Sequence, residues 1–122
     1  MKYLLDSTIL IDNSNGVAAA SRFLLEHHES CSISPVTRAV VLSGLDGGAA
    51  LAMGRYLDGY AHVDWQKSDS DLAAQLRRKH RWKLPDAFQA AFAQGRSLKL
   101  VTRNTKDFEP SKHSFVFVPY RS

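Results

Sequence analysis

The stretch Met1–Thr8, MKYLLDST, contains the feature that decides the fold. Residues 3–5 (YLL) form a short apolar run of the kind that becomes a fully buried strand, and the run stops at Asp6. Open parallel sheets bind their ligands just beyond the carboxyl ends of their strands. Asp6 is therefore either a site residue or the cap of a helix that Ser7 and Thr8 help to start. Other carboxylates at equivalent places would favour the site.

The composition is that of a globular domain. The chain has 122 residues, of which 44% are hydrophobic and 23% charged. No apolar stretch approaches the roughly 18 residues that a membrane span needs, and Lys2 with one short apolar run is too little for a secretory signal. We therefore expect a cytoplasmic protein without a membrane partner. Cys31 is the only cysteine, so an internal disulfide is excluded. The formal net charge of +4 is compatible with a polyanionic partner but does not identify one.

Strand and helix patterns alternate along the chain. Strands are expected at residues 3–5, 30–34, 61–65, 98–101 and 114–118. Helices are expected at residues 8–12, at 17–28, over 36–60 (either continuous or broken around 46–48), from Ser68 into a basic segment, and from Pro85 to Gly95. The alternation predicts a single α/β domain over residues 1–122 with a mainly parallel sheet.

Three acidic residues occupy comparable places in this pattern. Asp6 ends the first strand, Asp86 lies in the first turn of a helix, and Asp107 follows the fourth strand. Strand carboxyl ends and helix amino ends share one edge of a doubly wound sheet, so these carboxylates are expected to converge. Taken singly, Asp86 complements a helix dipole and Asp107 caps a turn. Taken together they predict a site for Mg²⁺ or Mn²⁺, because a cation neutralises carboxylates that would otherwise repel one another.

A basic segment follows the fifth predicted helix. Residues 77–83 (RRKHRWK) contain five lysine and arginine side chains. A solvated helix end, where cations complement the macrodipole, explains any two of them. Five together beside Trp82 suggest a surface that faces phosphates, with Trp82 as a candidate for stacking on a base.

Four segments complete the pattern: YLLDSTILID (3–12), SPVTRAVVLSG (34–44), KLPDAFQAAFA (83–93) and LVTRNTKDF (100–108). In this order and spacing they resemble the motifs of PIN-domain ribonucleases of the VapC toxin type, and the resemblance covers nearly the whole chain. It implies a three-layer α/β/α fold around a five-stranded parallel sheet and Mg²⁺-dependent cleavage of RNA. It also implies inhibition by a cognate VapB-like antitoxin and a homodimer.

The resemblance assigns roles to individual residues. Asp6 matches the first metal-binding acid and Asp86 the third. The fourth acidic position falls on Asn104 or Asp107, and we favour Asp107 because it keeps a carboxylate. The polar residues expected to support the metal site are Ser7, Thr37, Thr102 and Asn104. The residues expected to contact RNA are Arg38, Arg77, Arg78, Lys79, Arg81 and Arg103.

One position departs from the family pattern. The second acid of the family is a glutamate, and Val40 stands in its place although Thr37 and Arg38 are present. Valine cannot bind Mg²⁺, so both metal affinity and the placement of the attacking water should suffer. We expect a nuclease that is weakened or inactive as written. The valine is either a substitution that was made or selected so that a toxic protein could be tolerated during expression, or a sign that the chain is a naturally degenerate member.

Two other classes of function stay open at this point. A catalytically degenerate PIN-like module that binds RNA or an antitoxin is favoured by Val40. A receiver-like or phosphatase-like α/β domain also holds Mg²⁺ at strand ends, but Asp6 has no adjacent acidic partner. Phe23, Leu24 and Leu51 are candidates for a surface that contacts an antitoxin or a second copy, with a core role as the alternative.

Overall fold

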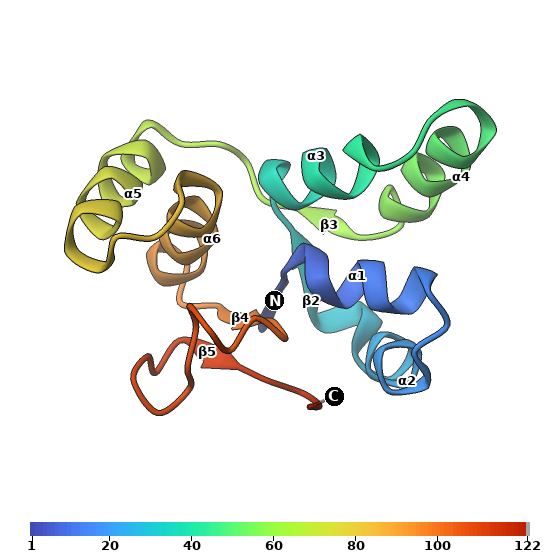
Figure 1. Cartoon of the computed structure of the whole chain (residues 1–122). Helices are drawn as coiled ribbons and strands as arrows, with labels where there is room; N and C mark the ends of the chain where they lie inside the picture. Colours follow the sequence, from blue (N-terminus) through green and yellow to red (C-terminus); the bar gives the residue numbers. More distant parts are fainter. Residues whose placement is uncertain (122) are drawn as a thin grey trace.

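A five-stranded parallel sheet lies between helices in the computed structural model, which describes residues 1–121 (Figure 1). The strand order is β3-β2-β1-β4-β5, and every neighbouring pair is parallel. The strands are β1 (Tyr3–Leu5), β2 (Cys31–Ile33), β3 (Ala61–His62), β4 (Lys99–Val101) and β5 (Val116–Phe117). All five predicted strands are confirmed, each within its expected range. The three-layer α/β/α fold that the resemblance implies is confirmed as well.

The helices connect the strands as the sequence pattern predicts. They are α1 (Ser7–Ser14), α2 (Ala18–His27), the 3₁₀ turn η1 (His28–Ser30), α3 (Pro35–Ser43), α4 (Gly47–Leu57), α5 (Lys67–His80) and α6 (Leu84–Gly95). The predicted 36–60 helix is broken, because α3 ends at Ser43 and Gly47 has a φ of +53°, which side chains other than glycine rarely adopt. No helix within residues 1–121 is both long and apolar enough to cross a membrane.

Strand β1 supplies both hydrophobic cores, because successive side chains on a strand point to opposite faces. Leu4 lies in one core together with Phe92 of α6 and with Phe108. Leu5 lies in the other core, among residues of α1 to α4, and there it meets Val101 of β4. Cys31 is buried in this second core. Figure 1 shows the two groups of helices on either side of the strands.

Phe23 and Leu24 belong to the core and not to a docking surface. Their side chains are 8% and 3% exposed and pack in the cluster that contains Leu5. The core alternative is therefore confirmed for both of them. Leu51 of α4, by contrast, is 60% exposed.

Trp82 is a core residue, so its prediction as a base-stacking side chain was wrong. Its ring is 5% exposed, stacks on His80 with centroids 4.2 Å apart, and meets Phe108 edge-on at 4.9 Å. Arg77 donates from Nη1 to the Trp82 carbonyl at 2.8 Å, and Arg81 ends α5 in the left-handed region with a φ of 59°. This short connection turns the indole inward, so the basic segment is a charged helix end without an exposed aromatic ring.

A partly buried ion pair joins the start of α5 to the end of α6. Arg96 donates from Nη1 to Asp69 Oδ1 at 2.8 Å and from Nη2 to Oδ2 at 2.9 Å. The same carboxylate accepts from the backbone N–H of Gln66 at 2.8 Å, which completes a capping box at the N-terminus of α5. The hydrogen bond from Arg96 holds the pKa of Asp69 below its usual value. This carboxylate therefore fixes the packing of the helix pair.

We predict that Asp69→Ala lowers the free energy of unfolding by about 2–4 kcal/mol, because it leaves a guanidinium half-paired and removes a cap. Asp71→Ala is the matched control, since Asp71 is exposed on the same helix and should change stability by no more than about 0.5 kcal/mol. Urea unfolding followed by circular dichroism measures both. Equal stability of the two variants would contradict the role given to Asp69.

Candidate active site

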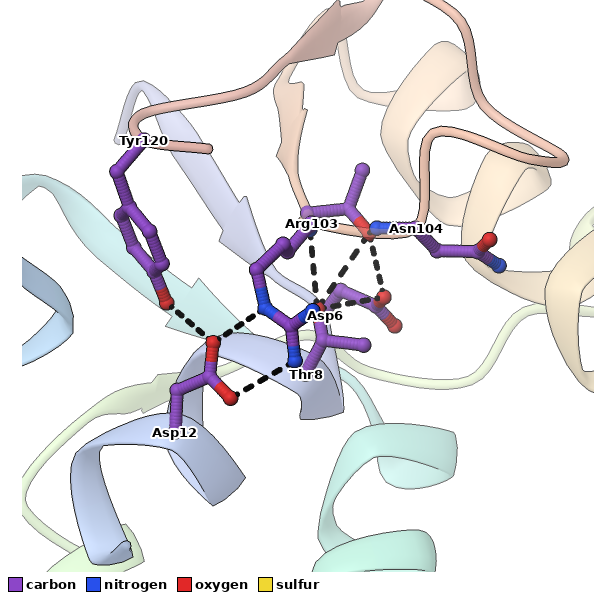
Figure 2. Close-up of polar contacts among 7 residues, drawn as sticks. Asp6, Thr8, Asp12, Arg103, Asn104 and Tyr120 are labelled. Carbon is purple, nitrogen blue, oxygen red and sulfur yellow. Dashed lines mark hydrogen bonds and ion pairs between the residues drawn. The ribbon is translucent and has the colours of Figure 1, made fainter. Parts of the chain in front are cut away.

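Asp6 is a site residue and does not cap α1 with its side chain. It occupies the N-cap position with extended backbone angles, but its carboxylate makes no capping hydrogen bond. Instead Oδ2 accepts from Thr102 Oγ1 at 2.7 Å and from Thr8 Oγ1 at 3.2 Å. Oδ1 accepts from Gln89 Nε2 at 3.2 Å. Asp6 is 6% exposed, and its carboxylate is held by residues that follow β4, begin α1 and lie on α6 (Figure 2 shows its threonine contacts).

Gln89 is the residue that sequence reasoning missed. Its side chain is 2% exposed, accepts from Ser34 Oγ at 2.6 Å and donates from Nε2 to Thr37 Oγ1 at 2.6 Å. Thr37 in turn donates from Oγ1 to the carbonyl of Leu5 at 2.9 Å. The sequence feature that could have indicated it is a glutamine at an apolar position of the α6 pattern. A buried amide needs several polar partners, so a glutamine at such a position suggests a polar network. The network ties α3 and α6 to the end of β1.

The loop after β4 returns to the same edge. Thr102 is fully buried, and its Oγ1 accepts from the N–H of Asn104 at 3.0 Å, while the N–H of Arg103 donates to Thr8 Oγ1 at 3.2 Å (Figure 2). Asn104 donates from Nδ2 to Asp107 Oδ2 at 3.2 Å. The two candidates for the fourth acidic position therefore touch each other at one place in the site.

Two arginines predicted to contact RNA are held by carboxylates of the chain. Arg103 donates from Nε to Asp12 Oδ2 at 2.5 Å and from Nη2 to Oδ1 at 2.9 Å, and Tyr120 donates to the same carboxylate at 2.8 Å (Figure 2). The hydrogen bond from Arg103 lowers the pKa of Asp12. Arg38 donates from Nη1 to Asp58 Oδ1 at 2.8 Å. Arg103 therefore braces the loop after β4 against α1, and Arg38 braces the end of α4.

Asp86 lies in the first turn of α6, as predicted, and the charges of Asp6 and Asp107 affect its pKa. Burial raises its pKa to about 6, and the charges of Asp6 and then Asp107 add to the effect, while Lys83 opposes it. The three carboxylates thus share one edge of the sheet. Their oxygens are hard donors of the kind that Mg²⁺ and Mn²⁺ prefer, and a cation would relieve their repulsion. Within residues 1–121, no group of three or more Asp, Glu, His or Cys side chains is arranged to hold a metal ion.

Val40 lies on α3 one turn beyond Thr37, and its side chain is 39% exposed. It lines an apolar cavity of about 220 Å³ together with Ile11, Leu45 and Met53. The position predicted to carry the second acid therefore presents methyl groups to a solvent-accessible hollow. Because the position is partly exposed, a longer charged side chain has room to reach water there.

We predict that Asp86→Asn stabilises the fold at neutral pH but not in acid. The folded protein holds the Asp86 proton up to a pKa of about 6, against 3.8 ordinarily, so this group lowers stability as the pH rises between those values. The shift corresponds to at most about 3 kcal/mol, and partial exposure reduces it to about 1–2 kcal/mol. Urea unfolding at pH 4 and pH 7.5 measures the difference between the variant and the unmodified chain. A difference that is the same at both pH values would contradict the assignment.

Comparison with known proteins places the chain in a family. A family model described as the PIN domain matches residues 3–109. A chain of a toxin–antitoxin complex from Klebsiella pneumoniae is 31% identical, with 99% of this chain and 100% of that chain covered and a TM-score of 0.89. DNA-bound VapBC from Salmonella typhimurium (21% identical, 89% and 91% covered, TM-score 0.76) shares the fold. VapBC2 from Rickettsia felis bound to a promoter DNA fragment also shares the fold (17% identical, 100% of this chain and 99% of that chain covered, TM-score 0.79). No curated protein sequence matches significantly. Motifs, fold and family model agree, and the chain belongs to the PIN-domain family.

Proposed function

We propose that this chain is a VapC-like toxin built as a Mg²⁺-dependent endoribonuclease, with its activity reduced by Val40. The observation that supports the proposal is the position of Asp6 at the end of β1, where buried hydrogen bonds fix its carboxylate and where its charge, with that of Asp107, raises the pKa of Asp86. The similarity to a chain of a toxin–antitoxin complex supports the assignment to the toxin.

Asp6, Asp86 and Asp107 are the residues that would hold the metal. When bound, Mg²⁺ supplies orientation of the attacking water and stabilisation of the negative charge that develops on the phosphate. The chain's own groups prepare the site, because Gln89 and Thr102 fix the Asp6 carboxylate in one orientation. A positioned carboxylate loses little further freedom on binding its ligand. No covalent nucleophile of the protein is required for this hydrolysis.

RNA would approach along exposed cations near the end of α5. Arg78, Lys79 and Arg81 are exposed, whereas Arg77 is engaged with the Trp82 carbonyl and Arg103 with Asp12. Exposed lysines and arginines attract the phosphate backbone without reading its sequence, so RNA binding should weaken as salt rises. The proposed partners are RNA as the substrate, a VapB-like antitoxin as the inhibitor, and a second copy of the chain.

Val40 favours one other function. A PIN-like module that has lost catalysis would still bind RNA or titrate an antitoxin through the same surfaces. A carboxylate introduced at Val40 distinguishes the two functions. In a nuclease it would complete the metal site and raise the affinity for Mn²⁺. In a pure binding module the affinity for Mn²⁺ need not change.

We predict that Val40→Glu raises Mg²⁺-dependent cleavage of transfer RNA or ribosomal RNA at least roughly tenfold and tightens Mn²⁺ binding, because it adds the missing hard ligand. Val40→Gln is the matched control, since it has nearly the same size and polarity without the charge. Asp6→Asn in the Val40→Glu background should abolish the gain. Cleavage is followed on gels with purified RNA, and Mn²⁺ binding by calorimetry.

Equal cleavage by the glutamate and glutamine variants would contradict the proposed nuclease. Tighter Mn²⁺ binding by Val40→Glu with no cleavage of either RNA would instead favour the binding module.

A further inference from the structure

A basic cavity of about 500 Å³ lies on the α5 and α6 side of the sheet, away from the carboxylates. It is bounded by the second half of α5, the end of α6, the start of β4 and residues 112–115. The basic residues that line it are Lys79, His80, Lys99, Lys112 and His113. No aspartate or glutamate of the described part of the chain lines it.

The lysines of this cavity have no carboxylate partners. Lys79, Lys99 and Lys112 are exposed, and none of them forms an ion pair with an acidic side chain of residues 1–121. Lys99 instead donates to the carbonyl of Ser114. Burial holds the pKa of His113 below its usual value, and the charges of His80, Lys112 and Lys79 lower it further. Positive charge is therefore crowded here without an internal counter-charge.

Packed aromatic rings form one wall of the cavity. His80 stacks on Trp82, and His113 meets both rings edge-on, at 5.1 Å from His80 and 5.2 Å from Trp82. Because Trp82 belongs to the core, the two imidazoles pack against a buried ring. A site that is already ordered loses little entropy on binding, so modest contacts suffice for affinity.

The cavity is separate from the candidate active site. Lys99 begins β4, whereas Thr102, which contacts Asp6, directly follows the last residue of that strand. The two residues therefore mark opposite ends of one parallel strand. Two members of the basic segment identified in the sequence, Lys79 and His80, face this cavity.

We infer that this cavity binds the phosphate group of a nucleotide, either free or within an RNA chain. Three lysines without acidic partners suit a ligand with concentrated negative charge, and the hydroxyls of Ser97 and Ser114 are additional donors in the lining. The volume falls in the range of small-ligand sites, and the imidazole rings offer apolar surface to a base or sugar. This inference goes beyond the proposed nuclease, because the binding needs neither a metal nor cleavage.

The test is direct binding by the unmodified chain in EDTA at low salt, measured by calorimetry. The probes are inorganic phosphate, AMP and a short single-stranded RNA. The double variant Lys99→Gln/Lys112→Gln removes two charges from the cavity that lie outside the basic segment of α5, and Arg22→Gln/Lys67→Gln removes two exposed charges elsewhere. We expect about tenfold weaker binding with the cavity variant, and no more than about a twofold change with the control. Melting temperatures confirm that both variants are folded.

Saturable binding of AMP that phosphate displaces identifies a free nucleotide as a source, and binding of RNA alone identifies the polymer. Either result supports the inference if only the cavity variant weakens it. Equal weakening by the two double variants, or no saturable binding of any probe, would overturn it. EDTA excludes metal-dependent cleavage, so this outcome is independent of the result for Val40→Glu.

Discussion

The buried side chain of Gln89 is the constraint on which the candidate site depends. Its amide joins α6 to α3 through Ser34 and Thr37 and reaches the Asp6 carboxylate at the end of β1. Each of these groups is buried, so each would lose a polar partner if the amide were removed. No buried side-chain nitrogen or oxygen of the described residues lacks a hydrogen-bond partner. The network is therefore complete, and it fixes the distance between the helices that flank the site.

The parallel topology explains why distant residues converge on this network. β1 is the central strand, with β2 on one side and β4 on the other. All carboxyl ends therefore point to one edge, and the segments that follow β1, β2 and β4 deliver Asp6, Ser34 and Thr102 to it. The ion pair between Asp12 and Arg103 then braces the loop after β4 against α1 (Figure 2). The same topology places the basic cavity at the opposite end of β4, which allows the chain to separate two charged sites of opposite sign.

The elements and the acidic positions could be predicted from the sequence, because they depend on local patterns. Three features could be recognised from the sequence alone: the apolar run that ends at Asp6, the cap Ser34 before Pro35, and Asp86 in the first turn of a helix. The directions of side chains could not be predicted. Trp82 turns into the core because Arg81 adopts a left-handed backbone conformation. A run of basic residues in the sequence does not indicate such a conformation.

The polar partners depend on three-dimensional neighbours. Arg103 and Arg38 carry the charge expected of residues that contact RNA, yet each meets a carboxylate supplied by another helix or its end. From the sequence, Gln89 is an ordinary residue of a helix. Its partners Ser34 and Thr37 become visible only when α3 and α6 are placed side by side. Val40, by contrast, is predicted from the sequence alone to stand at the acidic position, and the structure adds that its side chain borders an apolar hollow.

The proposed function depends on a metal site at the carboxyl edge of β1 and β4. The most direct measurement is the anomalous scattering of Mn²⁺ in crystals of the Val40→Glu variant. We expect a peak within about 2.5 Å of carboxylate oxygens of Asp6 and Asp86. A peak elsewhere, or none at this edge under saturating Mn²⁺, would contradict it.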